Sequence, residues 1–325
     1  MQEIIEPDDH DSTYGDNEVR IIRHLQYHFP NDDAENERLD LQHHIFYLTL
    51  DGKLGFAPPN KPDAKVGRVL DLGTGTGIWA MDFGDEHPEA EVRTQSVDQL
   101  IYSSDMFILQ VIGIDLSPSQ PQFVPPNVRF EIDDWDEEWT YSQPFDYIHS
   151  RMNNSSISDW EEYIRKSFEN LKPGGYIELQ EFTLPLSDDG TLAPEHALFQ
   201  SMKHLGEAAA KSGRAFIDLN KLGGLLEKAG FEDVQEYKFK WPSNTWPRDP
   251  KYKELGVWNH ENIVAGLQGF LMAALTRGLG WQAEEVNVLA AKAKQDMRNK
   301  SIHAYWPMIV VTARKPVPKD TTAEK

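Results

Sequence analysis

The sequence predicts an α/β fold in which helices cover both faces of a parallel β-sheet. Two observations predict it. Short apolar runs alternate with helical patterns along most of the chain, and the run at 68–72 meets a glycine-rich turn that opens a helix. This alternation produces a parallel sheet because each helix crosses back over one sheet face. The 325 residues are 39% hydrophobic, which is enough for one α/β domain with a cap, or for two domains.

The N-terminal part of the chain is acidic at first and then helical. Residues 1–15 carry several acidic side chains and little apolar character, which predicts a disordered N-terminus. Residues 16–50 show helical spacing with a break at 31–33, and the prolines of 58–62 predict a linker. We expect residues 16–62 to form a helical lid, although their acidity also suits a solvated face.

The rest of the fold, expected over residues 63–316, follows a strand–helix order. Buried parallel strands appear as continuous apolar runs. The predicted strands are 68–72, 111–115, 128–132, 145–150, 176–179, 234–240 and 308–313. Helices are expected at 78–86, 194–211 and 218–229, and from Asp159, which has a capping-box spacing with Glu162, to the stop at 172–175. Residues 317–325 are expected to be a disordered tail.

Two stretches depart from this order. Residues 242–301 carry two helical patterns, 263–275 and 283–297, between the last two strands. They predict a helical cap over a pocket, or a packing appendage without a ligand. Residues 93–111 fit no element of the scheme. They are an atypical insertion, either a surface loop, since long loops cost little closure entropy, or a retained intron that was translated.

Composition excludes several classes of protein. The net charge of −21 argues against direct nucleic-acid binding and against an anionic membrane surface. The absence of cysteine excludes a disulfide scaffold, a cysteine zinc site and a thiol nucleophile, and we expect no metal. The longest apolar stretch, 263–275, is too short to cross a bilayer. These features predict a soluble, cytoplasmic protein.

The motif that carries chemistry is Asp-Leu-Gly-Thr-Gly-Thr-Gly at 71–77, between a predicted strand and a helix. Its glycines let the backbone approach a ligand at a helix N-terminus. A dinucleotide fingerprint needs glycine where Ile78 stands, and a P-loop needs a lysine that is missing. Asp71 would repel a pyrophosphate but attract an ammonium group. This favours S-adenosylmethionine, which has an ammonium group and no phosphate.

Two further acidic positions support this ligand. Asp115 ends the second predicted strand, where a carboxylate can accept hydrogen bonds from both ribose hydroxyls. Asp134 and Trp135 follow the third strand, where a carboxylate can bind the adenine amine while an aromatic ring flanks the base. A turn residue at 115 or a solvated charge at 134 would be the simpler explanation of either position alone.

Together these motifs resemble the class I S-adenosylmethionine-dependent methyltransferases, and among them the fungal LaeA-like methyltransferase family. The resemblance covers residues 16–316 apart from 93–111. It implies a Rossmann-like sheet of seven strands, the last antiparallel, with N-terminal helices and a helical cap inserted before the last strand. The cofactor-binding residues that it implies are Asp71, Gly73, Thr74, Gly75 and Gly77 at the methionine moiety, Asp115 at the ribose, and Asp134 with Trp135 at the adenine.

Methyl transfer from a sulfonium needs positioning, and a general base only if the acceptor must lose a proton. The sequence singles out no catalytic residue. The candidates that could reach an acceptor are His149, Glu181 and His303, with Arg151, Gln180, Tyr305 and Trp306 beside them. Four tryptophans of the cap would suit an apolar or aromatic acceptor, or simply fill the core: Trp241, Trp246, Trp258 and Trp281.

The resemblance implies a setting in fungal secondary metabolism. Our first hypothesis is a methyltransferase that acts on a small-molecule acceptor. The alternative is a LaeA-like regulator that acts in the nucleus through velvet-type protein partners, although no basic import cluster is evident. A third hypothesis, a domain that binds the cofactor without turnover, is disfavoured by the intact Asp71, glycines and Asp115.

Overall fold

The computed structural model describes residues 32–88, 109–121 and 123–318. Several predictions lie outside these ranges: the N-terminal segment 1–15, the first predicted helix, nearly all of the insertion 93–111, and most of the tail after 317. The structure therefore bears on the lid only from residue 32 onward.

The described residues build one seven-stranded sheet in the order β3-β2-β1-β4-β5-β7-β6. Strands β1 to β5 pair in parallel, and β7 runs antiparallel to both of its neighbours, which confirms the predicted sheet. The strands are β1 Arg68–Leu72, β2 Gln110–Asp115, β3 Val128–Ile132, β4 Phe145–Arg151, β5 Leu171–Phe182, β6 Glu232–Pro242 and β7 Tyr305–Arg314.

Strand β5 begins earlier than the sequence predicts. Leu171 is buried and pairs with Phe145, and the register then shifts before Tyr176 pairs with Tyr147. The residues 172–175 therefore form an irregularity inside the strand, in which Gly174 has a φ of +82°. Their proline and glycines predicted a break because they interrupt the ladder, but the strand resumes on the same neighbour.

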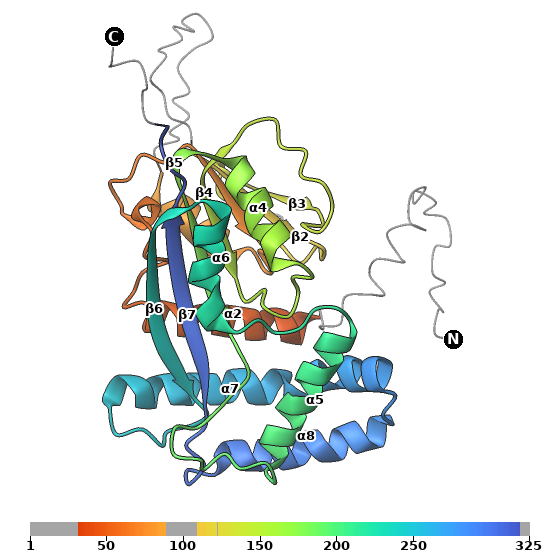
Figure 1. The fold of residues 1–325 in the computed structure, drawn as a ribbon. Coiled ribbons are helices and arrows are strands. Elements are labelled where there is room, and N and C mark those ends of the chain that lie inside the picture. The colour runs from red at the N-terminus through yellow and green to blue at the C-terminus, as the bar shows by residue number, and fades with distance from the viewer. Residues whose placement is uncertain (1–31, 89–108, 122, 319–325) are drawn as a thin grey trace, which may run out of the picture.

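The helices surround this sheet (Figure 1). The described helical segments are α2 Asp33–Thr49, η1 Pro58–Asn60, α3 Ile78–Glu86, α4 Trp160–Asn170, α5 Ala197–Lys211, η2 Leu219–Lys221, α6 Leu222–Ala229, α7 Pro250–Ala273, η3 Ala274–Leu279, which is a π-helix, and α8 Ala283–Arg298. The cap prediction is confirmed, since α7, η3 and α8 lie between β6 and β7.

Helix α7 starts thirteen residues before the predicted start at 263. Asp249 caps it by accepting a hydrogen bond from the backbone N–H of Tyr252, and Pro250 occupies the first turn, where its missing N–H costs nothing. Polar positions are frequent in its first half, and some of them, such as Asn259, are fully buried. A helix that buries polar side chains hides the apolar period on which the prediction depended.

The cap and the N-terminal helix α2 share one apolar core. Phe46 on α2 packs edge-on against Trp241, with ring centroids 4.8 Å apart, and Leu267 on α7 and Ala293 on α8 belong to the same cluster. The indole N–H of Trp241 also donates to Thr49 Oγ1 at 2.9 Å. This packing places α2 across the end of the sheet, beside α7 (Figure 1). No helix within the described ranges has the length and apolar character that crossing a bilayer requires.

Candidate functional site

The glycine-rich loop connects β1 to α3 and is fixed to the neighbouring strand. The backbone N–H groups of Gly73 and Thr74 both donate to the Ile114 carbonyl at 3.0 Å. Gly77 has a φ of +81°, and a Cβ there would lie 2.3 Å from the Phe130 ring. Glycine is therefore required at 77 both by backbone conformation and by space. The loop leaves its outer side open to a ligand at the start of α3.

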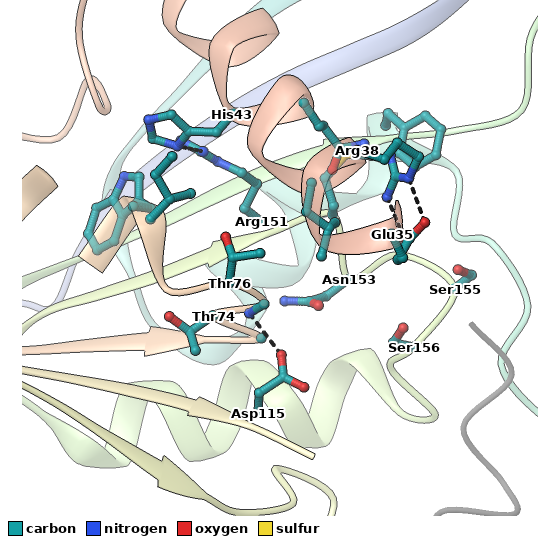
Figure 2. Close-up of a pocket in the computed structure, with 18 of the residues that line it drawn as sticks. Glu35, Arg38, His43, Thr74, Thr76, Asp115, Arg151, Asn153, Ser155 and Ser156 are labelled. Carbon is teal, nitrogen blue, oxygen red and sulfur yellow. Dashed lines mark hydrogen bonds and ion pairs between the residues drawn. The ribbon is translucent and has the colours of Figure 1, made fainter. Parts of the chain in front are cut away.

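Two buried carboxylates accept hydrogen bonds from this loop. Asp71 accepts from the Thr74 hydroxyl at 2.6 Å. Asp115 accepts from the backbone N–H of Gly75 at 2.9 Å (Figure 2) and from that of Ser117 at 3.0 Å. Burial raises the pKa of Asp115 above its ordinary value. The sequence predicted both acids as cofactor-binding residues, and both line the same pocket as Gly73 and Gly75, whereas Gly77 is not part of that lining.

His149 lies directly beside Asp71 in the sheet. Its ring stacks on Trp79 with centroids 3.7 Å apart and planes inclined by 5°. Burial lowers the pKa of His149, so the imidazole is neutral and its Nδ1–H donates to Asp71. Nε2 then carries the lone pair, and it has no hydrogen-bond partner among the described residues although the side chain lines the pocket. A polar ligand group is the natural partner of such an atom.

The pocket extends from the glycine-rich loop to α2, the segment after β4, and the cap. Figure 2 shows how Glu35, Arg38 and His43 of α2 face the loop residues Thr74 and Thr76. The polar lining residues are Glu35, Arg38, Gln42, His43, Asp71, Thr74, Thr76, Asp115, His149, Arg151, Asn153, Ser155 and Ser156. The apolar ones include Leu39, Ile78, Trp79, Leu116, Trp135, Met152, Phe182, Leu205, Phe216, Ile263 and Phe270.

Arg151 is a partly buried cation on this wall. Its guanidinium donates to Gln180 Oε1 at 2.9 Å and to His43 Nδ1 at 3.1 Å, and lies 4.1 Å from the Phe46 ring centroid. Burial lowers the pKa of Arg151 to about 10, so the group stays charged at neutral pH. No carboxylate among the described residues forms an ion pair with it. A partly buried positive charge without a carboxylate partner is suited to bind an anionic ligand group.

A second buried arginine connects α2 to the cap. Arg38 donates through Nε and Nη2 to both carboxylate oxygens of Glu35, and through Nη1 to Asn262 on α7 at 2.5 Å. Arg38 and Glu35 are each 6% exposed. Because Arg38 binds both Glu35 on its own helix and Asn262 on α7, it connects α2 to the cap at the pocket.

The structure separates the other predicted site residues into two groups. Trp135 lines the pocket and is 6% exposed. Asp134 does not line it, since its Oδ1 accepts from the backbone N–H of Asp136 within a turn. Glu181 lies behind the wall, where it accepts from the N–H groups of Asn153 and Asn154 at 3.1 and 2.9 Å. Burial raises the pKa of Glu181 to about 8.

His303 and the cap tryptophans also lie outside the pocket lining. His303 Nδ1 is 2.6 Å from Asp189 Oδ2 on the surface, and the rings of His303 and Trp246 are 4.9 Å apart. Trp241 and Trp306 are buried in the core. Trp258 contacts His44, Trp281 contacts His204, and the Tyr305 hydroxyl donates to Asp188. The expectation that these tryptophans line an acceptor pocket is therefore wrong, and the aromatic lining comes from Phe182, Phe216 and Phe270 instead.

Several pocket residues were not predicted from the sequence. They are Glu35, Asn153, Phe182, Phe216 and Phe270. Asn153 fills the space beside the first glycine, because a Cβ on Gly73 would lie 2.5 Å from Asn153 Oδ1. One sequence signal was present: Glu35 and Arg38 stand three residues apart, a spacing at which opposite charges meet on one helix face.

Comparisons with known proteins agree with this geometry. A family model described as a methyltransferase domain matches residues 41–236. The chain is 38% identical to methyltransferase pytC of Aspergillus terreus, over 89% of this chain and 83% of that protein. It is 34% identical to the probable methyltransferase tdiE of Emericella nidulans, over 87% and 83%. It is 35% identical to the secondary metabolism regulator LAE1 of Cochliobolus heterostrophus, over 89% and 90%.

The family match covers more than half of the chain, and the glycine-rich loop with Asp71 and Asp115 lies inside it. The buried acids and the open backbone cradle fit a ligand that is positively charged and carries a ribose, as S-adenosylmethionine does. The chain thus belongs to the S-adenosylmethionine-dependent methyltransferases, with the class I fold and S-adenosylmethionine as its methyl donor.

Proposed function

We propose that this protein transfers a methyl group from S-adenosylmethionine to a small-molecule acceptor in fungal secondary metabolism. The observation that carries the proposal is the composition of one pocket. Its inner wall consists of the glycine-rich loop and buried acids, whereas Met152, Phe182, Ile263 and Phe270 line it from the segment after β4, from the end of β5 and from the cap. Such a pocket has room for an apolar acceptor beside the methyl donor. The naming of pytC and tdiE as methyltransferases supports the same reading.

Within this proposal, each part of the cofactor has a partner in the chain. Asp71 and the glycine-rich loop face the amino-acid ammonium, and Arg151 binds the carboxylate attached to the same carbon atom. Asp115 accepts from the ribose hydroxyls. We assign the adenine to Trp135 rather than to Asp134, because Trp135 lines the pocket and Asp134 does not.

When bound, the cofactor supplies a methyl group on a sulfonium, which is activated for in-line displacement without further chemistry. The chain's own residues then position and shield the reactants. The paired Glu35 and Arg38 hold α2 over the pocket and exclude water, and the cap residues orient the acceptor. The His149 Nε2 lone pair can hold a proton or accept a hydrogen bond, but the lowered pKa makes it a weak base.

A second candidate is a regulator that acts through protein partners. The 35% identity to the regulator LAE1 over 90% of that protein favours it. In that case the methyl acceptor would be a protein side chain, and the setting would be the nucleus with a velvet-type partner. Our proposal places the acceptor among small molecules because apolar residues line the pocket on the side away from the glycine-rich loop.

A labelling experiment separates the two candidates. The full chain is incubated with S-adenosylmethionine that carries an isotopically labelled methyl group, in an extract of a filamentous fungus divided by ultrafiltration into a small-molecule fraction and a protein fraction. Label that accumulates in small-molecule products other than S-adenosylmethionine, above the level in the same extract without the chain, supports the proposal. Label confined to the protein fraction supports the regulator instead, and no transfer in either fraction contradicts both.

A further inference from the structure

A second cavity, with a volume of about 290 Å³, adjoins the cofactor pocket. It lies between α5 and the π-helix η3 at the end of α7. The two cavities share Ser155, Leu205, Phe216 and Phe270 in their walls. A molecule that reaches from the second cavity past these two phenylalanines therefore enters the pocket in which we place the methyl donor.

The wall of this second cavity is made of small residues on both helices. Ala208 and Ala209 of α5 line the cavity together with Ala274 and Gly278 of η3. A Cβ on Gly278 would lie 3.2 Å from Ala208 Cβ, so the helices approach closely at the inner end and leave the space beside it open. The π-helical turn matters because such turns are rare and occur frequently at functional sites.

The charges on this wall are all positive. Lys211 at the end of α5 and Arg277 on η3 line the cavity, and no acidic residue lines it. Neither cation forms an ion pair with any of the residues that the structure describes. In a chain with a net charge of −21, two cations beside one apolar cavity produce a local preference for anions.

We propose that the cavity between α5 and η3 binds the body of the methyl acceptor, a flat apolar or aromatic molecule with an anionic group that pairs with Arg277. The inference rests on the proposed small-molecule methyltransferase function and gives it a substrate class. The shared phenylalanines hold the acceptor's ring system, and Lys211 adds a second positive charge at the rim. The reacting atom then projects past Phe216 and Phe270 toward the cofactor.

The test uses two fluorescent probes that differ by one charge. These are 8-anilinonaphthalene-1-sulfonate and N-phenyl-1-naphthylamine, which has the same rings and no sulfonate. Both are titrated into the full chain saturated with S-adenosylhomocysteine, so that the cofactor site is filled. S-Adenosylhomocysteine affinity, measured by calorimetry for every variant, shows that the fold and the cofactor site persist.

Ala209→Phe fills the cavity, and Ala210→Phe places the same ring on the exposed side of the same helix. We expect Ala209→Phe to lower the affinity of the chain for both probes by about tenfold, and Ala210→Phe to leave both affinities unchanged. Arg277→Met removes the charge. It should lower the affinity only for the probe that carries the sulfonate, by about threefold to tenfold. Arg298→Met, on the exposed end of α8, is the matched control and should change neither affinity.

Equal effects of Ala209→Phe and Ala210→Phe would overturn the inference, as would an Arg277→Met effect that is the same for both probes. The labelling experiment separates this failure from that of the proposed function. If small molecules are methylated and Ala209→Phe leaves the KM for them unchanged, the cavity assignment fails while the function stands. If no small molecule is methylated, the function fails whatever the probes show.

Discussion

His149 Nδ1 lies 2.7 Å from Asp71 Oδ1, and the two side chains are 0% and 3% exposed. The residues are direct partners in the register of the parallel strands β1 and β4. The pairing follows from the order of the sheet, which places the acid of the glycine-rich motif next to a histidine 78 positions away. The histidine thereby fixes the orientation of the Asp71 carboxylate, which we propose faces the ammonium group of the methyl donor.

Replacing this histidine tests its role in positioning Asp71. His149→Phe keeps a ring against Trp79 but removes the Nδ1–H donor. We expect the free energy of unfolding to fall by about 1–3 kcal/mol, since a buried carboxylate loses a hydrogen bond. Calorimetry should show a clear loss of S-adenosylhomocysteine affinity. His303→Phe, outside the pocket lining, should leave that affinity unchanged, and equal losses in the two variants would refute the role.

Asp115→Asn should weaken S-adenosylhomocysteine binding by about tenfold to a hundredfold. The neutral asparagine amide replaces a carboxylate, which accepts charge-assisted hydrogen bonds. The amide N–H₂ would also oppose the backbone N–H of Gly75 or Ser117, to which the carboxylate oxygens now bind. Asp134→Asn serves as the comparison and should bind normally. Normal binding by Asp115→Asn, or a large loss in Asp134→Asn, would reverse our assignment of the two acids.

Arg151→Met tests whether Arg151 binds the amino-acid part of the cofactor or the nucleoside part. S-Adenosylhomocysteine carries a carboxylate, whereas 5′-methylthioadenosine lacks the whole amino-acid end. If Arg151 binds the carboxylate, the variant should lose at least tenfold in affinity for the first ligand, which is the scale of a charged hydrogen bond, and bind the second as before. Parallel losses for both ligands would show that Arg151 acts on the fold and not on the carboxylate.

Glu181 should make stability depend on pH. Its pKa is about 8 in the folded protein and 4.5 ordinarily, so between these values the unfolded chain has released a proton that the folded chain keeps. The contribution of Glu181 to the free energy of unfolding is therefore greatest at low pH, and it is lost as the pH rises from about 4.5 toward 8. The lowered pKa values of His43 and His149 make the free energy of unfolding rise with pH, but only at or below pH 6.5, their ordinary pKa value.

Chemical denaturation of the wild type and of Glu181→Gln between about pH 7 and pH 8 isolates this contribution, with a limiting slope of about 1.4 kcal/mol per pH unit for one proton. The glutamine cannot titrate, so the free energy of unfolding of the variant should vary less with pH than that of the wild type. Identical pH profiles would mean that the buried carboxyl is already ionised in this range.

The sheet and the cofactor loop could be predicted from sequence because their signals are local. A continuous apolar run such as 68–72 is sufficient to place a buried strand, and glycines at 73, 75 and 77 are sufficient to place the loop. The edges of elements were less certain. Strand β5 resumes pairing with β4 after a proline and two glycines, and such residues in a local pattern predict the end of an element.

The pocket's outer wall was harder to predict because it depends on distant partners. Arg38 and Glu35 look like solvated charges on an acidic helix, yet they are buried through a hydrogen bond from Arg38 to Asn262, 224 positions away. Tryptophan content likewise suggested an aromatic acceptor site, but Trp241 is buried in the core while phenylalanines line the pocket. Only the packing of α2 against α7 decides which of these side chains face the ligand.

The central claim, that the loop at 73–77 cradles the methyl donor, is tested most directly by calorimetric titration of S-adenosylhomocysteine into two alanine variants. Gly77→Ala and Gly190→Ala both place a Cβ on a residue with positive φ, but the first Cβ meets the Phe130 ring and the second meets nothing within 4 Å. We predict that the wild type and Gly190→Ala bind one molecule per chain, and that Gly77→Ala loses binding. Binding by Gly77→Ala equal to that of Gly190→Ala would contradict the account.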